Sequence, residues 1–378
     1  MDGYYGITPG IVSVPDADLF VVVPTIRPEL LTEFCERWVD PDLNVKFIFV
    51  HDRPRLLWDG PLPESPLITH LCWADIDAEL GNRRWIIPRR SDCVRSYGFL
   101  RAAQMGARYI LSLDDDCDPQ YDRREFFEAH LRPLILGLRP SFSTTGYHDA
   151  GNRPRGLPDA AQDRIIDRKI PVAINHGLWD GVLDRSGRDE QDVIDRLGGK
   201  QPKNEYLDEG LCVVPHRMFY PMCGMNVCFH VRMLSAMYFT LQGHWYHPDT
   251  GELTKLPYDR WGDIWCGAIS KAVCDVLGCA VTSGDPHVYH SRRSNTLANI
   301  EKEAAGLDLH PHIVRAMLDL VDDGRPQMWH LMRQVSESLD DLAFDIMSQN
   351  EAQAAYLAVL SQAIREWRLL TIAPEDQH

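Results

Sequence analysis

The chain has 378 residues, of which 44% are hydrophobic and 25% charged, and its formal net charge at neutral pH is −16. This composition is typical of a soluble globular protein, and the negative charge argues against nucleic acid or an anionic membrane as the main partner. No apolar run approaches the roughly 18 residues of a membrane span and no leader-like segment opens the sequence, so we expect a cytoplasmic protein.

The first 113 residues alternate between strand patterns and helix patterns. Short apolar runs predict strands at 19–24, 45–50 and 108–113. Helical spacing of apolar residues predicts helices at 27–38 and 91–106. Such alternation is typical of an α/β fold with a mostly parallel sheet covered by helices.

The pattern loosens over residues 141–215, which are rich in Gly, Pro, Arg and Asp and contain only short apolar stretches. We expect long loops close to a ligand there. Beyond them, the sequence predicts a strand pair or a strand and turn at 219–230, and an amphipathic helix at 263–278. Residues 279–295 supply a last strand and a polar loop.

Three helices are predicted after residue 299, and none carries a cluster of potential catalytic residues. We expect them to serve packing or oligomerisation, and we divide the chain into an α/β domain, residues 1–300, and a helical extension, residues 301–378. Ten cysteines without a C-x-x-C spacing predict neither a disulfide framework nor a zinc site. We interpret Cys223 and Cys228 as small core residues.

Three consecutive aspartates, Asp114, Asp115 and Asp116, directly follow the strand predicted at 108–113. Adjacent carboxylates repel one another unless a positive charge lies among them. In an extended chain Asp114 and Asp116 point to the same side, so both can converge on one divalent cation. A solvated acidic loop is the alternative. The preceding strand favours a ligand site, because ligands of open α/β sheets bind beyond the carboxyl ends of strands.

Other polar residues follow the predicted strands or open a helix beside them. They are Thr25, Arg27, His51, Asp52, Arg53, Asp92, Arg95 and the residues from His290 to Asn295. Singly, each has a structural alternative: Asp52 as a turn residue, Asp92 as a first-turn helix residue, and His290 as a packing histidine. Together, they predict a site for a diphosphate-bearing ligand and a metal.

Six stretches, VVVPTIR, SLDDDC, INHGLW, PMCGMN, DIWCGA and HSRRSN, resemble in this order the reversibly glycosylated polypeptide family, known in plants as UDP-arabinopyranose mutases. The resemblance covers roughly residues 18–302 and leaves the C-terminal helices outside it. It implies a GT-A-like fold, a Mn²⁺ or Mg²⁺ cofactor and interconversion of the pyranose and furanose forms of UDP-arabinose. It also implies attachment of sugar to an arginine of the protein itself.

The resemblance also implies roles for particular residues. The metal would be held by Asp114, Asp116 and His290, and the carboxylate of Asp263 would face the sugar. The residues implied to contact the UDP-sugar are Thr25, Arg27, Asp52, Asp92, Arg95, Asp114, Asp115, His176, Trp179 and Asn226.

The glycosylated arginine of the family falls on Arg155, in PRGLP, with Arg153 two positions away. A guanidinium with a pKa above about 12 is a poor nucleophile, and no base lies next to Arg155 in the sequence. We therefore expect Arg155 to act mainly through its charge, on the diphosphate or the departing UDP.

Three functions fit these observations, and the first is our prediction: a homo-oligomeric, metal-dependent UDP-sugar mutase with the self-glycosylation that the resemblance implies. The second is a glycosyltransferase that passes the sugar to a separate acceptor, which the divergent residues 141–215 favour. The third is a catalytically silent nucleotide-sugar-binding assembly protein. The intact aspartates and His290 argue against the third.

Overall fold

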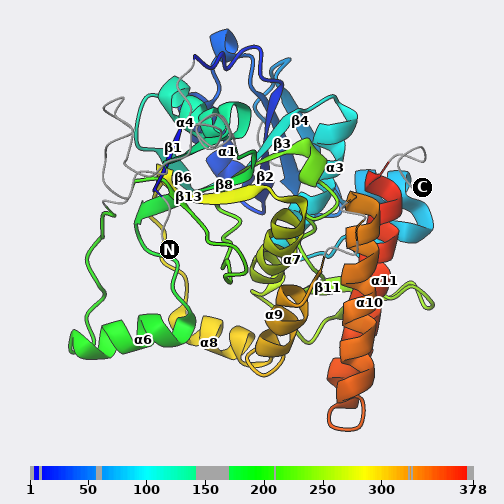
Figure 1. The fold of residues 1–378 in the computed structure, drawn as a ribbon. Coiled ribbons are helices and arrows are strands. Elements are labelled where there is room, and N and C mark those ends of the chain that lie inside the picture. The colour runs from blue at the N-terminus through cyan, green and yellow to red at the C-terminus, as the bar shows by residue number, and fades with distance from the viewer. Residues whose placement is uncertain are drawn as a thin grey trace, which may run out of the picture.

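The computed structural model describes residues 4–7, 11–56, 62–141, 170–207, 210–321, 324 and 327–372. A large β-sheet forms the centre, and helices cover both of its faces (Figure 1). The strands are β1 (Tyr4–Ile7), β2 (Leu19–Thr25), β3 (Lys46–His51), β4 (Ile68–Leu71), β5 (Tyr109–Leu113), β6 (Cys117–Pro119), β7 (Leu138–Ser141), β8 (Val172–Gly181), β9 (Cys212–Val213), β10 (Asn226–His230), β11 (His244–Tyr246), β12 (Leu253–Lys255) and β13 (Ala280–His290). The helices are α1 (Leu31–Trp38), α2 (Trp73–Leu80), α3 (Arg95–Gln104), α4 (Arg123–Leu136), α6 (Gly187–Arg196), α7 (Gly262–Leu277), α8 (Thr296–Ala304), α9 (His310–Leu318), α10 (Met328–Ile346) and α11 (Glu351–Thr371).

The large sheet has nine strands in the order β4-β3-β2-β5-β10-β8-β13-β6, with β9 also paired to β13. Strands β4, β3, β2 and β5 are parallel to their neighbours in this part of the sheet. Strand β10 is antiparallel to β5 and β8, whereas β13 is parallel to β8. The predicted class, a mostly parallel helix-covered sheet with a C-terminal helical region, is confirmed.

Each face of the sheet has its own apolar core. On one face, Trp38 of α1 lies in edge contact with Phe126 of α4, with ring centroids 4.8 Å apart. On the other face, buried residues of α10 and α11 belong to the same cluster as sheet residues such as Val22. Hydrogen bonds reinforce this packing, since the Tyr356 hydroxyl donates to the Leu241 carbonyl over 2.6 Å. The C-terminal helices therefore form part of the main core.

Strand β8 corrects the expectation of loops throughout residues 141–215. Its ten residues lie between β10 and β13, inside the sheet. The polar Asn175 and His176 interrupt the apolar pattern that identifies a buried strand. Both are nevertheless buried, and the Asn175 side chain accepts a hydrogen bond from the Thr282 hydroxyl of β13 over 2.6 Å. Buried polar groups with internal partners are compatible with a central strand.

Two other predictions need smaller corrections. The helix predicted at 27–38 begins at Leu31, after a 3₁₀ turn over Pro28–Leu30. Of the strand pair or strand and turn predicted at 219–230, only β10 is a strand. The three helices predicted after residue 299 are found as α9, α10 and α11, and α8 precedes them. None of the helices in the described ranges combines the length and apolar character needed to cross a membrane.

Candidate active site

Asp115 follows the carboxyl end of β5, and its carboxylate oxygens accept hydrogen bonds from the protein itself. Its side chain is 2% exposed and accepts a hydrogen bond from the Thr25 hydroxyl over 2.5 Å. The Arg27 Nε donates to the same carboxylate oxygen over 3.2 Å, and Nη2 of Arg27 donates to the other oxygen. Burial raises the pKa of Asp115, and these hydrogen bonds oppose the shift. Asp115 thus joins the ends of β2 and β5 and fixes Arg27 at the rim.

Asp116 and His290 form the best candidate for a metal site. The His290 Nε2 lies 3.9 Å from Asp116 Oδ1, and Arg27 Nη1 lies 3.0 Å from Asp116 Oδ2. The other ring nitrogen of His290, Nδ1, is 2.9 Å from the Val182 carbonyl. Because a carbonyl only accepts hydrogen bonds, we assign the proton to Nδ1, which leaves the Nε2 lone pair facing Asp116. This tautomer is the one a metal-binding histidine needs.

The described residues contain no group of three or more His, Cys, Asp or Glu side chains arranged to hold a metal ion. Asp114, the third predicted ligand, instead accepts a hydrogen bond from Arg95 over 2.7 Å. A carboxylate and an imidazole still fit a Mg²⁺-like or Mn²⁺-like cation, because such ions often take most of their ligands from substrate phosphates and water.

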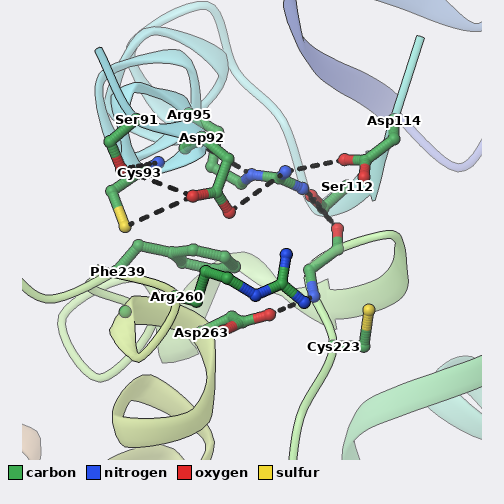
Figure 2. A network of polar contacts seen from close by, with 12 residues as sticks. Ser91, Asp92, Cys93, Arg95, Ser112, Asp114, Cys223, Phe239, Arg260 and Asp263 are labelled. Carbon is green, nitrogen blue, oxygen red and sulfur yellow. Dashed lines mark hydrogen bonds and ion pairs between the residues drawn. The ribbon is translucent and has the colours of Figure 1, made fainter. Parts of the chain in front are cut away.

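Arg95 connects the sheet to the loops on its rim (Figure 2). Its side chain is 1% exposed, and all five of its N–H donors are used. Nε donates to the Asp92 carbonyl over 3.1 Å, and Nη1 donates to the Ser112 hydroxyl over 2.6 Å and to the Gly224 carbonyl. Nη2 donates to Asp114 over 2.7 Å and to Asp92 over 3.5 Å. Burial opposes the charge, but the carboxylates more than offset it and raise the pKa of Arg95.

Asp263 lies in the first turn of α7 and faces Arg95 and Asp92 across the site (Figure 2). Its Oδ1 accepts the backbone N–H of Ile264 over 2.9 Å, and its Oδ2 accepts that of Gly224 over 3.3 Å. Burial, together with the nearby charge of Asp92, raises the pKa of Asp263 to about 7. A carboxyl group with this pKa can accept and return a proton at neutral pH.

Gln242 holds the start of α7 against Asp92. Its Oε1 accepts the backbone N–H groups of Trp261 and Gly262, each over 2.8 Å. Its Nε2 donates to Asp92 Oδ1 over 2.9 Å. Gly262 is required at this point because a Cβ atom there would lie 2.2 Å from the Cys93 sulfur. The buried Gln242 side chain therefore sets the position of the helix start that carries the catalytic candidate.

His176 and Trp179, both on β8, lie behind the site. The His176 Nδ1 is 3.1 Å from the Ser283 hydroxyl, and its Nε2 accepts the backbone N–H of Cys223 over 3.2 Å. Burial lowers the pKa of His176 to about 4, so the ring is neutral. The Trp179 Nε1 is buried and has no acceptor within the described part of the chain. The structure thus gives His176 a role in positioning Cys223.

Asn226 is fully buried and bonded to two neighbouring strands. Its Nδ2 donates to the carbonyls of Leu178 over 2.9 Å and Pro286 over 2.8 Å. Its Oδ1 lies 2.8 Å from the Nε2 of His130. These partners use the donors and acceptor of the amide, so Asn226 holds the sheet together beneath the site.

Asp52 follows β3, as predicted, and is 8% exposed. It accepts the indole N–H of Trp73 over 2.7 Å and the backbone N–H groups of Arg90 and Ser91 over 2.9 and 2.8 Å. Burial raises the pKa of Asp52, and these three hydrogen bonds oppose the shift. Asp52 therefore fixes the loop that leads into Asp92.

Three further residues at this site were not predicted: Asp184, Arg260 and Gln242. Arg260 Nη2 lies 3.3 Å from Asp184, and the Cys223 thiol donates to Asp184 over 3.5 Å. Cys228 is a buried core residue as interpreted, whereas the thiol of Cys223 points into the site (Figure 2). Arg260 stands three positions before Asp263, which is the one sequence signal that could have drawn attention to it.

Comparison with known proteins extends these observations. A family model described as "Reversibly glycosylated polypeptide" matches residues 14–370. The chain belongs to this family. The match runs into α11, so the C-terminal helices lie inside the family similarity, contrary to the extent of roughly 18–302 inferred from the sequence blocks.

Reversibly glycosylated polypeptide relatives include two Arabidopsis thaliana proteins. "Probable UDP-arabinopyranose mutase 4" is 30% identical over 298 residues, which are 77% of this chain and 74% of that protein. "UDP-arabinopyranose mutase 1" is 28% identical over 298 residues, 77% of this chain and 76% of that protein. Among solved structures, a mannosyltransferase from Pyrobaculum calidifontis, in complex with GDP-Man and Mn²⁺, aligns over 96% of this chain and 86% of its own. Its TM-score of 0.38 and identity of 12% are too low to support an assignment.

Proposed function

We propose that this protein interconverts the pyranose and furanose forms of a UDP-pentose such as UDP-arabinose. The observation that carries the proposal is the placement of Asp263 in the first turn of α7, where its carboxyl group faces Arg95 and Asp92 across the site (Figure 2). The rise of its pKa to about 7 by burial supports a role in proton transfer. Relatives over most of the chain bear the name UDP-arabinopyranose mutase, which supports the same activity.

The chemistry of this isomerisation suits such a carboxyl group. The bond between the anomeric carbon and UDP breaks, another sugar hydroxyl oxygen bonds to that carbon, the bond from the carbon to the former ring oxygen breaks, and the bond to UDP forms again. One sugar hydroxyl loses a proton and the former ring oxygen gains one, so no co-reactant is consumed. Asp263 would take the first proton as a carboxylate and supply the second as an acid. As a carboxylate, it would also stabilise positive charge at the anomeric carbon.

We propose that Asp116 and His290 hold a divalent cation, Mn²⁺ or Mg²⁺, with diphosphate oxygens and water as further ligands. Asp114 stays a proposed third ligand, because one of its carboxylate oxygens has no side-chain partner among the described residues. When bound, the cation would offset the charge of the diphosphate. The chain itself would hold Arg27 against Asp116, as the 3.0 Å ion pair between them indicates.

The direct test is incubation of the protein with Mn²⁺ and a panel of UDP-sugars, followed by chromatography of the nucleotide-sugars. We expect one UDP-pentose to be converted into its ring isomer without release of UDP. Accumulation of free UDP together with a glycosylated acceptor would favour a glycosyltransferase. Tight binding of UDP-sugar without any conversion would favour the catalytically silent binding protein.

The role of Arg155, self-glycosylation, the oligomeric state and the cellular location are also proposals. Arg155 and Arg153 lie outside the described residues, so the charge-based role of Arg155 and self-glycosylation rest on the sequence. A homo-oligomer stays a prediction. A cytoplasmic location is supported by the ten cysteines, all of which carry free thiols, as is usual in a reducing compartment.

A further inference from the structure

Arg260 differs from Arg95 in how many of its donors the protein uses. Arg95 commits all five N–H groups to protein acceptors. Arg260 commits two, from Nε to Glu303 over 2.8 Å and from Nη2 to Asp184 over 3.3 Å. No acceptor among the described residues meets its other three N–H groups. Its side chain is 29% exposed, so these donors are within reach of a ligand.

The free donors of Arg260 point into a strongly acidic space. Its guanidinium lies between Asp92 and Asp263 (Figure 2), and both carboxylates interact with its charge. Burial opposes the charged form, but Asp184 and Glu303 more than compensate, so the pKa of Arg260 lies above its ordinary value. The guanidinium therefore stays charged and acts as a cation, not as a nucleophile.

The backbone at Arg260 is held in an uncommon conformation. Its φ angle is +64°, in the left-handed region, which is unfavourable for a non-glycine residue. Such conformations persist where the surroundings impose them, and they gather at functional sites. Here the surroundings are the hydrogen bonds from Trp261 and Gly262 to Gln242, directly after Arg260 in the chain.

Glu303 of α8 positions the guanidinium. Its Oε1 accepts from Arg260 Nε, and its Oε2 accepts the backbone N–H of Gly187, the first residue of α6, over 2.8 Å. The Trp261 indole N–H donates to the Glu303 carbonyl over 3.1 Å. The Glu303 side chain is 14% exposed, and each of its carboxylate oxygens has a partner. Helices α6 and α8, which lie outside the sheet in Figure 1, thus determine where Arg260 points.

We infer that Arg260 binds the phosphate nearest the sugar in the diphosphate ligand, and that Glu303 is its positioning residue. The inference rests on the proposed function. Asp92, Asp184 and Asp263 would repel a diphosphate, so a cation among them that keeps free N–H donors favours its binding. A guanidinium with free N–H groups is suited to two-point contact with phosphate oxygens. Arg95 has no donor left for this contact.

The test is calorimetric titration of the full chain with UMP and with UDP at fixed Mn²⁺. Arg260→Gln should weaken UDP binding roughly tenfold or more, the order expected for a charge-assisted hydrogen bond, and leave UMP binding unchanged. Arg217→Gln is the matched control. Arg217 also has a left-handed φ, +58°, but its guanidinium donates to the Leu318 carbonyl of α9. The control should bind both nucleotides like the wild type.

Glu303→Ala tests whether Glu303 positions the Arg260 guanidinium or only stabilises the fold. It should weaken UDP binding in the same selective way, and the double variant with Arg260→Gln should lose no more than Arg260→Gln alone. Equal UDP affinity in the wild type and in Arg260→Gln, or an equal loss of UMP binding, would overturn the inference and leave the proposed function standing. A wild type that binds neither UDP nor UDP-sugar would overturn the proposed function, and the inference with it.

Discussion

The two sides of the candidate active site differ in how far the protein satisfies its own polar groups. On the sheet side, Arg95, Asp115 and Asn226 use their hydrogen-bonding capacity within the chain. On the helix side, Arg260 keeps free donors and Asp263 has a pKa of about 7. Polar groups whose hydrogen bonds are made within the protein stabilise the fold. Groups that keep free hydrogen-bond donors, or whose pKa is shifted, are available to a ligand. Apart from the proposed cation site at Asp116 and His290, the sheet side would therefore act as a rigid frame, and the helix side would supply the group that transfers protons.

The largest effect is expected on the sheet side. Arg95→Leu removes a buried cation, leaves Asp114 without its arginine partner and leaves the Ser112 hydroxyl and the Gly224 carbonyl with only the hydrogen bond between them, which should cost about 3–5 kcal/mol of stability as well as activity. Urea denaturation measures the loss. The control is Arg101→Leu on the same helix, whose 34% exposed side chain pairs with Glu79 and should cost less than about 1 kcal/mol. Equal costs would contradict the role of Arg95.

On the helix side, Asp263→Asn should lower the rate of sugar interconversion roughly 10²–10⁴-fold. Because the base is the ionised form, wild-type kcat/KM should rise with pH through the pKa of about 7, and the variant should lack this rise. Asp249→Asn, at an exposed turn, should behave like the wild type. An unchanged rate in Asp263→Asn would contradict the proton-transfer role of Asp263, on which the proposed function depends.

The same group has a consequence for stability. The folded-state pKa of about 7 lies above the ordinary 3.8, so the folded protein retains a proton that the unfolded chain has released between these values. The contribution of Asp263 to stability therefore falls as pH rises from about 4 to about 7. Asp263→Asn should flatten this part of the stability profile in urea denaturation at several pH values. A profile as steep as that of the wild type would show that another group is responsible.

Asp116→Asn tests the proposed cation site. Replacement of a carboxylate by an amide should weaken Mn²⁺-supported UDP binding by about tenfold or more, and leave binding without metal unchanged. Asp118→Asn is the matched control, because Asp118 pairs with Arg37 over 2.8 Å instead of facing His290. UDP affinity that does not depend on Mn²⁺ in the wild type would contradict the cation site itself.

The smallest effect on stability is expected at Trp179, a residue on the sheet side of the site. Trp179→Phe removes a buried N–H that has no acceptor in the described ranges, which favours the folded state, but it also removes packing contacts. The two effects should cancel to within about 1 kcal/mol of the free energy of unfolding. Trp38→Phe should cost more, because the Trp38 indole donates to the Cys117 carbonyl over 2.9 Å. Thermal denaturation compares the two, and a larger loss at Trp179 would reveal a partner for its N–H.

Much of the sheet side could be predicted from the sequence. Uninterrupted apolar runs identify β2, β3 and β5, and the carboxyl ends of these parallel strands bring Thr25, Asp52 and Asp115 to one rim. What could not be predicted is how each polar group is used. His176 and Asn226 belong to stretches that resemble the family, but their hydrogen-bond partners depend on the pairing of β8, β10 and β13.

The helix side was harder to predict because its contacts join distant parts of the chain. Arg260 is separated by 43 residues from Glu303, which holds its guanidinium, and by 76 from Asp184. No local pattern encodes such a pair. The domain boundary predicted between residues 300 and 301 would place Glu303 in a different domain from the active site. In the structure, Glu303 contacts Arg260 and Trp261 across this boundary.

The most direct test of the central claim is to approach the sugar equilibrium from both directions. The protein is incubated with Mn²⁺ and either UDP-arabinopyranose or UDP-arabinofuranose, and the nucleotide-sugars are separated by chromatography over time. We expect both reactions to reach the same ratio of the two forms, without accumulation of free UDP. If both nucleotide-sugars stay unchanged, or if UDP is released in step with the loss of the nucleotide-sugar, the protein is not a UDP-sugar mutase.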